Sequence, residues 1–195
     1  PWAANYARID QVPAWWWWNP VTWEQLTAHV KKLPREQEPL SFDPGVSVVI
    51  QNGRVYRNGR DAGSAWKFVE SARREANPDY RWEPPFPGGR HEWLPLGVWA
   101  LTQEEQGQAT MFLQLSISRD GLISGGFTNV QTGEDLPVKG GTNREEQRVA
   151  FHIGNRTDTV IECGLSHLTQ DIAGAFIHYA DGNSQTWLLV RLPSP

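Results

Sequence analysis

The feature that most constrains the fold is a series of short β-rich runs, separated by turn signals, that fills the second half of the chain. Within residues 111–117, aliphatic side chains alternate with Phe112, Gln114 and Ser116, which is the period of a strand with one buried face. Turn sequences such as Arg119-Asp120-Gly121 separate the runs. The pattern predicts eight strands, at about 96–103, 111–118, 122–129, 136–140, 146–153, 159–164, 174–180 and 185–192.

The short connections between these runs favour an antiparallel meander. A meander of eight strands loses its exposed edges by closing on itself, so we expect a small closed barrel in a mainly β (α+β) protein. The alternating aliphatic residues between Met111 and Ile117 predict that side chains fill its interior.

Helical patterns and a hairpin precede the barrel. Apolar residues recur at helical spacing between Thr22 and Leu33, and Thr22 with Gln25 forms a capping box before Pro34 ends the pattern. The runs 46–50 and 54–56 flank Asn52-Gly53, a strong hairpin signal, and Asn58-Gly59 ends the second strand. A helix is expected over 64–76.

Proline-rich stretches divide the chain into segments. Residues 34–44 and 77–93 favour linkers that cross surfaces in extended conformation. We therefore expect four parts: a Trp-rich arm with a short helix (1–45), a hairpin with a helix (46–77), a proline and aromatic linker (78–93) and the barrel (94–195).

Charge and apolar content exclude several classes of protein. Eighteen basic and 22 acidic residues give a net charge of −4, without the basic patch of a nucleic-acid binder. No apolar stretch approaches the roughly 18 residues of a transmembrane helix. Cys163 is the only cysteine, so no intrachain disulfide forms, and we interpret it as a small buried hydrophobe.

Tryptophan is the unusual component of the sequence, with 11 residues among 195. Trp66, Trp93, Trp99 and Trp187 lie in periodic contexts and are predicted to be core residues. The run Trp15–Trp18 lies between Pro13 and Pro20, which favours an extended arm.

Side chains of an extended segment alternate between faces, so the four rings of this run cannot all reach one core. We predict a protein interface here, with packing on the barrel itself or contact with a saccharide or lipid surface as alternatives. Its residues are Trp2, Trp15, Trp16, Trp17, Trp18 and Trp23.

Signatures of catalysis are absent from the sequence. It has no phosphate-binding glycine loop, no paired-cysteine motif and no nucleophile elbow. The tightest polar cluster is Glu162, His167 and Asp171, which we interpret as turn and strand-end residues in preference to a metal or acid/base site. We expect no enzyme activity, no metal and no cofactor.

Several segments together resemble a family of uncharacterised secreted proteins of planctomycete-type bacteria. They include residues 47–59 (SVVIQNGRVYRNG), 93–101 (WLPLGVWAL) and 187–192 (WLLVRL), and the resemblance covers about 46–192. The resemblance implies an extracytoplasmic location, and it assigns no catalytic residues to this sequence. The predicted meander is also similar in architecture to avidin-type and lipocalin-type ligand barrels, although fold analogy alone does not give function.

Two functional hypotheses follow from these observations. The first is a non-enzymatic structural or accessory module of an extracytoplasmic assembly, which docks onto other protein subunits, like or unlike, through the aromatic arm. The alternative is a barrel that binds a small molecule or saccharide at its mouth.

Overall fold

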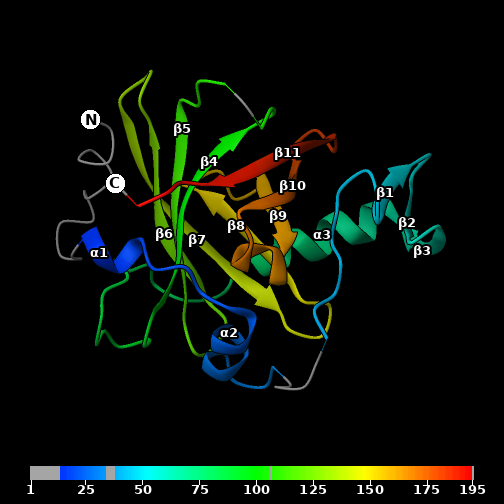
Figure 1. The fold of residues 1–195 in the computed structure, drawn as a ribbon. Helices are drawn as coiled ribbons and strands as arrows, with labels where there is room; N and C mark the ends of the chain where they lie inside the picture. The colour runs from blue at the N-terminus through cyan, green and yellow to red at the C-terminus, as the bar shows by residue number, and fades with distance from the viewer. Residues whose placement is uncertain (1–13, 34–37, 106, 195) are drawn as a thin grey trace.

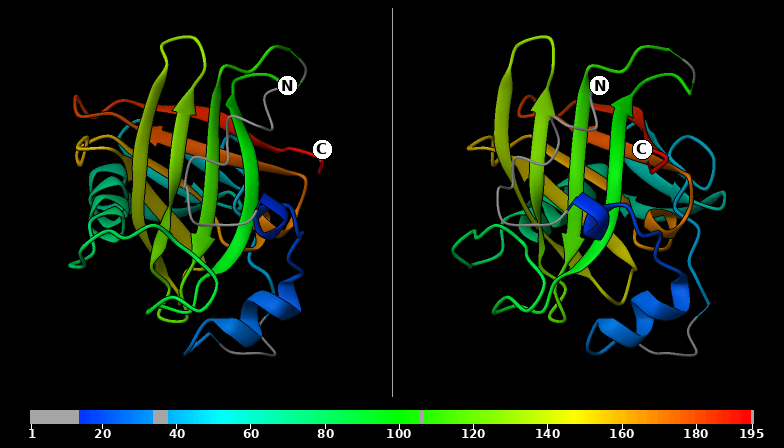
Figure 2. Two further views of the ribbon diagram at one scale, coloured as in Figure 1. Left: turned by 90° about the vertical axis from the view of Figure 1, so that its left-hand side faces the viewer. Right: turned by 60° about the vertical axis from the view of Figure 1, so that its left-hand side comes forward.

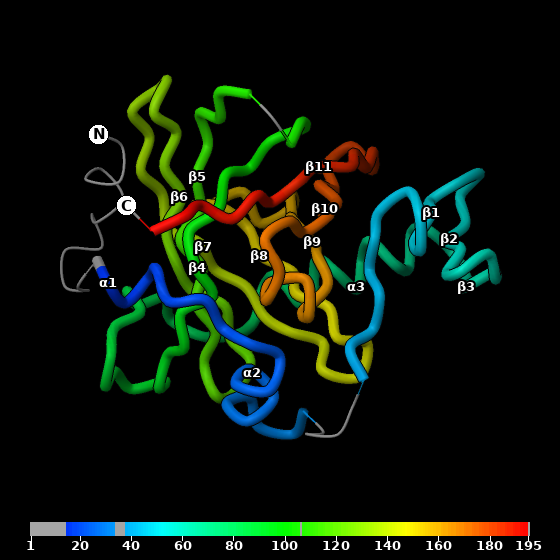
Figure 3. The backbone as a smooth tube through the Cα atoms, viewed as in Figure 1, coloured from blue at the N-terminus to red at the C-terminus, as the bar shows by residue number. Residues whose placement is uncertain are grey.

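Eight antiparallel strands close into a barrel in the computed structural model, which describes residues 14–33, 38–105 and 107–194 (Figure 1). In chain order they are β4 (Leu94–Thr102), β5 (Met111–Ile117), β6 (Ile123–Asn129), β7 (Glu134–Asn143), β8 (Arg148–Ile153), β9 (Val160–Gly164), β10 (Ile172–His178) and β11 (Ser184–Arg191). Each strand pairs with its neighbours in the chain, and β11 returns to pair with β4 (Figure 3). The predicted fold class, a closed meander, is confirmed.

The barrel core is built by the predicted alternation along its strands. Leu113, Leu115 and Ile117 of β5 are fully buried among other interior side chains. Burial of each such side chain contributes about 1.5–3 kcal/mol. The other face of β5 is also buried, at Phe112, Gln114 and Ser116, so the prediction of one buried face was wrong. The reason is that the chain before the barrel covers its outer surface.

One cover consists of the proline-rich segment 78–93 and α1 (Ala14–Trp17), which lie over the outer face of β4 to β7 (Figure 2). The Tyr80 hydroxyl donates to the Ile123 carbonyl at 2.6 Å, and Trp82 Nε1 donates to the Val138 carbonyl at 2.9 Å. The segment predicted as a linker is therefore fastened to the sheet by its aromatic side chains.

A second cover is α3 (Ala65–Ala76), which lies across β7, β8 and β9. Ala72 and Ala76 pack against Ala150 and Val160 at this contact. A Cβ at Gly141 would lie 2.7 Å from the carbonyl oxygen of Glu75, so the close approach of helix and sheet requires glycine there.

A small sheet precedes α3 and stands beside the barrel (Figure 1). It contains β1 (Val48–Gln51), β2 (Arg54–Arg57) and β3 (Arg60–Ser64). The predicted hairpin of β1 and β2 is present, and β2 ends before Asn58-Gly59 as predicted, but the chain then turns into a third strand that was not predicted. Residues 60–64 carry no apolar alternation that could have predicted this strand.

One end of the barrel is closed by α2 (Trp23–His29) (Figure 2). Its predicted capping box forms, because Thr22 and Gln25 exchange side-chain to backbone hydrogen bonds. Leu26 and Val30 enter the barrel core, while His29 Nε2 lies 3.2 Å from the Ile117 carbonyl at the end of β5. Between β9 and β10, the 3-10 helix η2 (Ser166–Thr169) adds Leu168 to the same core.

None of the helices in the described ranges has the length and apolar character of a membrane span.

Candidate functional site

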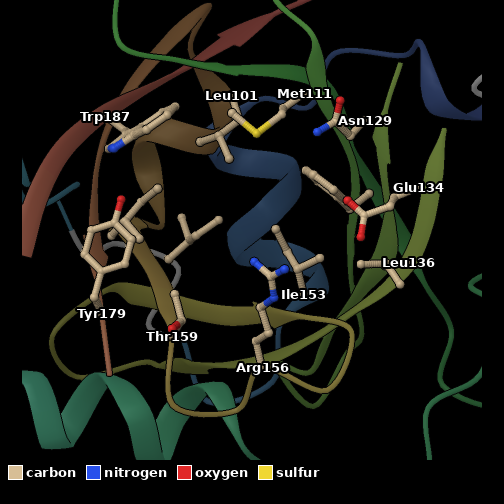
Figure 4. A pocket seen from close by; sticks show the side chains of 13 residues that line it. Leu101, Met111, Asn129, Glu134, Leu136, Ile153, Arg156, Thr159, Tyr179 and Trp187 are labelled. Atoms are coloured by element: carbon tan, nitrogen blue, oxygen red, sulfur yellow. The ribbon is translucent and has the colours of Figure 1, made fainter. Parts of the chain in front are cut away.

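A cavity of about 220 Å³ opens at the end of the barrel opposite α2 (Figure 4). All eight barrel strands, or the turns that join them at this end, contribute to its wall. The apolar lining consists of Leu101, Met111, Phe127, Leu136, Ile153, Ile161, Ile177 and Trp187. The polar lining consists of Asn129, Glu134, Arg156, Thr159 and Tyr179. We call this cavity the barrel mouth.

The hollow at this end follows from where interior side chains stop. Near α2, interior residues such as Leu115 and Ile123 are fully buried and fill the barrel. Toward the mouth the same interior face carries Met111, Leu136 and Ile153, which are only half-buried. The predicted filling of the interior thus holds for one half of the barrel and fails for the other.

Polar groups at the rim of the mouth are held on opposite sides of the opening (Figure 4). On one side, the Tyr179 hydroxyl and Trp187 Nε1 both donate to Gln185 Oε1, at 2.9 and 3.3 Å. Asn129 and Glu134 lie across the opening from them. Arg156 projects from the turn after β8 and, within the described structure, forms no ion pair. These groups are positioned to orient a bound molecule.

The lining of the barrel mouth is mainly apolar, and its polar groups are those of Asn129, Glu134, Arg156, Thr159 and Tyr179. A mainly apolar concave wall with a few convergent polar groups is typical of small-molecule sites. These residues carry no sequence signal of a shared site, because they come together from strand ends far apart in the chain.

The predicted polar cluster of Glu162, His167 and Asp171 is not a single site. Glu162 is fully buried on the outer face of β9, beneath α3, where it forms an ion pair with Arg148 and lies against His178 Nε2. The side chain of Asp171 is almost fully exposed, and Arg191 Nε lies 3.9 Å from it.

The third member, His167, lies near neither of the other two. Its Nε2 accepts a hydrogen bond from the Phe42 amide at 3.3 Å, and Nδ1 lies 3.6 Å from Asp43. Burial lowers the pKa of His167 below its ordinary value. In the part of the chain that the structure describes, no group of His, Cys, Asp or Glu could hold a metal ion.

A buried chain of polar contacts surrounds Glu162 instead. His178 Nε2 lies 2.8 Å from Glu162 Oε2, and His178 Nδ1 lies 2.7 Å from Ser184 Oγ. The order Ser184, His178, Glu162 has the contacts of a hydrolase triad. However, His178 and Glu162 are fully buried beneath Phe68 and Phe176, so this imidazole is closed to a substrate. We interpret this series of polar contacts as an attachment of the outer elements to the barrel.

The tryptophan run forms the short helix α1 instead of the predicted extended arm. Pro20 lies beyond the end of this helical turn, where it does not interrupt it. Trp16 and Trp17 are buried against Trp93, Val98 and other residues of the barrel's outer face, whereas Trp15 is 65% exposed.

The other residues of the predicted interface lie in different surroundings. Trp18 packs partly on the same outer face as Trp17, and Trp23 packs partly against the barrel core from α2. Trp2 lies outside the described residues. Docking of another protein stays a prediction, for which Trp15 offers the most accessible ring among the described residues of the predicted interface.

The remaining tryptophans divide between core and surface. Trp93 and Trp99 are buried as predicted, and Trp187 is half-buried in the wall of the mouth. Trp66 is 68% exposed, so its assignment to the core was wrong. It lies outside the buried stripe of α3, which consists of Phe68, Val69, Ala72 and Ala76.

Comparison of the chain with protein-family models, with curated proteins and with solved structures finds no match. The resemblance to secreted planctomycete-type proteins, and the extracytoplasmic location that it implies, therefore stay predictions.

Proposed function

We propose that this protein binds a small, mainly apolar molecule in the barrel mouth. The observation that carries the proposal is a cavity that is open at one end of a closed barrel whose other end is filled by α2. Small eight-stranded barrels of this geometry hold one small ligand when side chains leave the space free.

The volume of the mouth limits the size of the ligand. A dry protein cavity of about 150 Å³ accepts benzene. The mouth measures about 220 Å³, so the part of the ligand that it encloses is a single substituted ring, a bicyclic ring or a short alkyl chain. The rim groups near Trp187 and Asn129 would bond to a polar end that remains near water.

Ligand-detected NMR with indole and 1-hexanol as probes tests the proposal. The variant Leu136→Trp should fill the cavity and weaken probe binding at least about tenfold, because the large ring occupies the space that the probe needs. Its matched control is Val130→Trp, which adds the same ring at a residue that is 46% exposed and is not part of the wall.

Two results would contradict binding in the mouth. One is the absence of binding for both probes at millimolar concentration. The other is equal loss of binding in the Leu136 and Val130 variants, which would show that the probes meet the protein elsewhere. Circular dichroism of both variants, compared with the unmodified chain, checks that the barrel is intact.

A further inference from the structure

Two side chains in the wall of the barrel mouth carry hydrogen-bond donors that have no acceptor among the described residues. One is Asn129, at the end of β6, and the other is Arg156, in the turn after β8. In Figure 4 the nitrogen of the Asn129 amide and the guanidinium of Arg156 are both turned toward the cavity. The chemistry of the ligand's polar end follows from these donors.

The turn between β6 and β7 fixes the orientation of the Asn129 amide. Its Oδ1 accepts hydrogen bonds from the backbone amides of Gln131, at 3.0 Å, and Thr132, at 3.3 Å. A carbonyl oxygen has two lone pairs, so both are used within this turn. A reversed amide would lose both bonds, and Nδ2 therefore stays directed into the mouth.

Arg156 supplies a positive charge at the rim. Its backbone is held in the turn, because its N–H donates to the Ile153 carbonyl at 3.3 Å and its carbonyl accepts from the Thr159 amide at 3.2 Å. Its side chain is exposed and, within the described ranges, makes neither an ion pair nor a hydrogen bond. A guanidinium group donates in a planar fork that matches the two oxygens of a carboxylate.

Donors elsewhere in the mouth are already used. The Tyr179 hydroxyl and Trp187 Nε1 both donate to Gln185 Oε1. An acceptor group on a ligand therefore finds its free donors away from these two rings, at Asn129 and Arg156.

Glu134 is the acidic residue of the described wall and faces Asn129 across the pairing of β6 with β7. Its Oε2 accepts a hydrogen bond from the Thr132 hydroxyl at 3.1 Å, and the residue is exposed. Water and salt screen an exposed charge, so Glu134 reduces the attraction of Arg156 for an anion without abolishing it.

We propose that the ligand of the barrel mouth is a small monocarboxylate with an alkyl chain or an aromatic ring. Arg156 pairs with the carboxylate at the rim, and Asn129 Nδ2 adds a neutral donor. The chain or ring lies against apolar wall residues such as Leu101 and Phe127. This inference rests on the proposed binding in the mouth and adds the chemical class of the ligand.

Ligand-detected NMR with hexanoate, 1-hexanol and hexylamine tests the inference, because the three probes share one chain and differ only in the polar end. At about pH 7.5 the acid is ionised and the amine is protonated. At constant ionic strength, hexanoate should bind at least about fivefold more tightly than either of the others, which is the upper effect of an exposed ion pair.

Arg156→Gln removes the charge that selects the carboxylate. It should weaken hexanoate binding about fivefold and leave 1-hexanol binding unchanged. The side chain of Arg156 has no partner in the described structure, so the fold should be retained, which circular dichroism verifies. The matched control is Arg74→Gln, at an exposed arginine of α3 outside the wall, which should leave the binding of both probes unchanged.

Two further variants test the neighbouring groups. Asn129→Asp keeps an oxygen for the amides of Gln131 and Thr132 but replaces the donor by a negative oxygen, so it should weaken hexanoate binding at least about fivefold. Glu134→Gln removes the opposing charge and should strengthen hexanoate binding about twofold.

The outcomes separate this inference from the proposed function on which it rests. If 1-hexanol binds and hexanoate binds no more tightly, the carboxylate assignment is overturned and binding in the mouth stands. Tighter binding of hexylamine, or equal loss of hexanoate affinity in the Arg156 and Arg74 variants, also overturns the assignment. The absence of binding for all three probes would overturn the proposed function itself.

Discussion

Arg191 joins three parts of the molecule through a single side chain. Its guanidinium lies 4.1 Å from the centre of the Trp99 ring. It donates to three carbonyl groups: Leu96 at 2.9 Å, Leu168 at 2.7 Å and Gln170 at 3.1 Å. Gly97 provides the space, because a Cβ there would collide with Arg191 Nη1. The last strand, the first strand and the connection through η2 are therefore fixed to one another at the end of the barrel near α2.

The planar shape of this guanidinium, and not its charge alone, is needed for these contacts. We predict that Arg191→Lys lowers the free energy of unfolding by about 2–4 kcal/mol, because one ammonium group cannot reach three carbonyls on two separate segments, β4 and the connection through η2. Urea denaturation measures the change. Arg54→Lys, at an exposed ion pair with Asp61, is the control and should change stability by less than about 1 kcal/mol. Equal losses in both variants would contradict this account.

At the scale of elements, α2 couples the closed end of the barrel to pH. Burial lowers the pKa of His29 below its ordinary value of 6.5, and Arg119 adds to the lowering, although the bond to the Ile117 carbonyl opposes it. Above pH 6.5, His29 is neutral in the folded and in the unfolded chain. As the pH falls below that value, the unfolded chain takes up the proton first, so the folded state loses stability.

We therefore predict that the free energy of unfolding decreases as the pH is lowered from 6.5 through the lowered pKa of His29. His29→Gln should make this decrease smaller, because glutamine still donates to Ile117 and does not titrate. Urea midpoints at about pH 7 and about pH 5 for both chains give the measurement. An unchanged pH dependence in the variant would show that other groups, such as His152 and His167, whose pKa values are also lowered by burial, account for it.

The elements that sequence predicts well are those with a local cause. The barrel strands follow from alternation and turn residues, and α2 and α3 follow from helical spacing, all of which are properties of neighbouring residues. Helix α1 depends on contacts with distant parts of the chain, so its local pattern misleads, and the third strand of the small sheet pairs with β2 without an apolar pattern of its own. The same holds for the barrel mouth, since its wall exists only once the strand ends meet.

At the scale of the whole molecule, the barrel and the chain that precedes it share two apolar clusters. Val98 and Phe112 on the outer face are buried with Trp16 and Trp17, and Ala150 and Val160 are buried by α3. The boundary predicted at residue 94 coincides with the start of the first barrel strand. However, residues before it pack against barrel residues on both covered faces. Without residues 14–93, these surfaces would meet water.

We predict that a chain of residues 94–195 alone lacks a cooperative unfolding transition and associates through its uncovered faces. Residues 14–195 should remain monomeric apart from any natural partner and should unfold in one step. Size-exclusion chromatography and urea denaturation followed by near-ultraviolet circular dichroism compare the two chains. A monomeric 94–195 chain with a sharp transition would show that the barrel is an independent domain.

The order of the barrel strands also has a consequence for the rate of folding. Every pairing in the barrel except that of β4 with β11 joins strands that follow one another in the chain. Hairpins of this kind form within microseconds, because little chain entropy is lost when near neighbours meet. The seam between β4 and β11 brings together Trp99 and Arg191, and the entropy lost on closing the ring is concentrated there. Closure of this seam is therefore expected to be the late, rate-limiting event of folding.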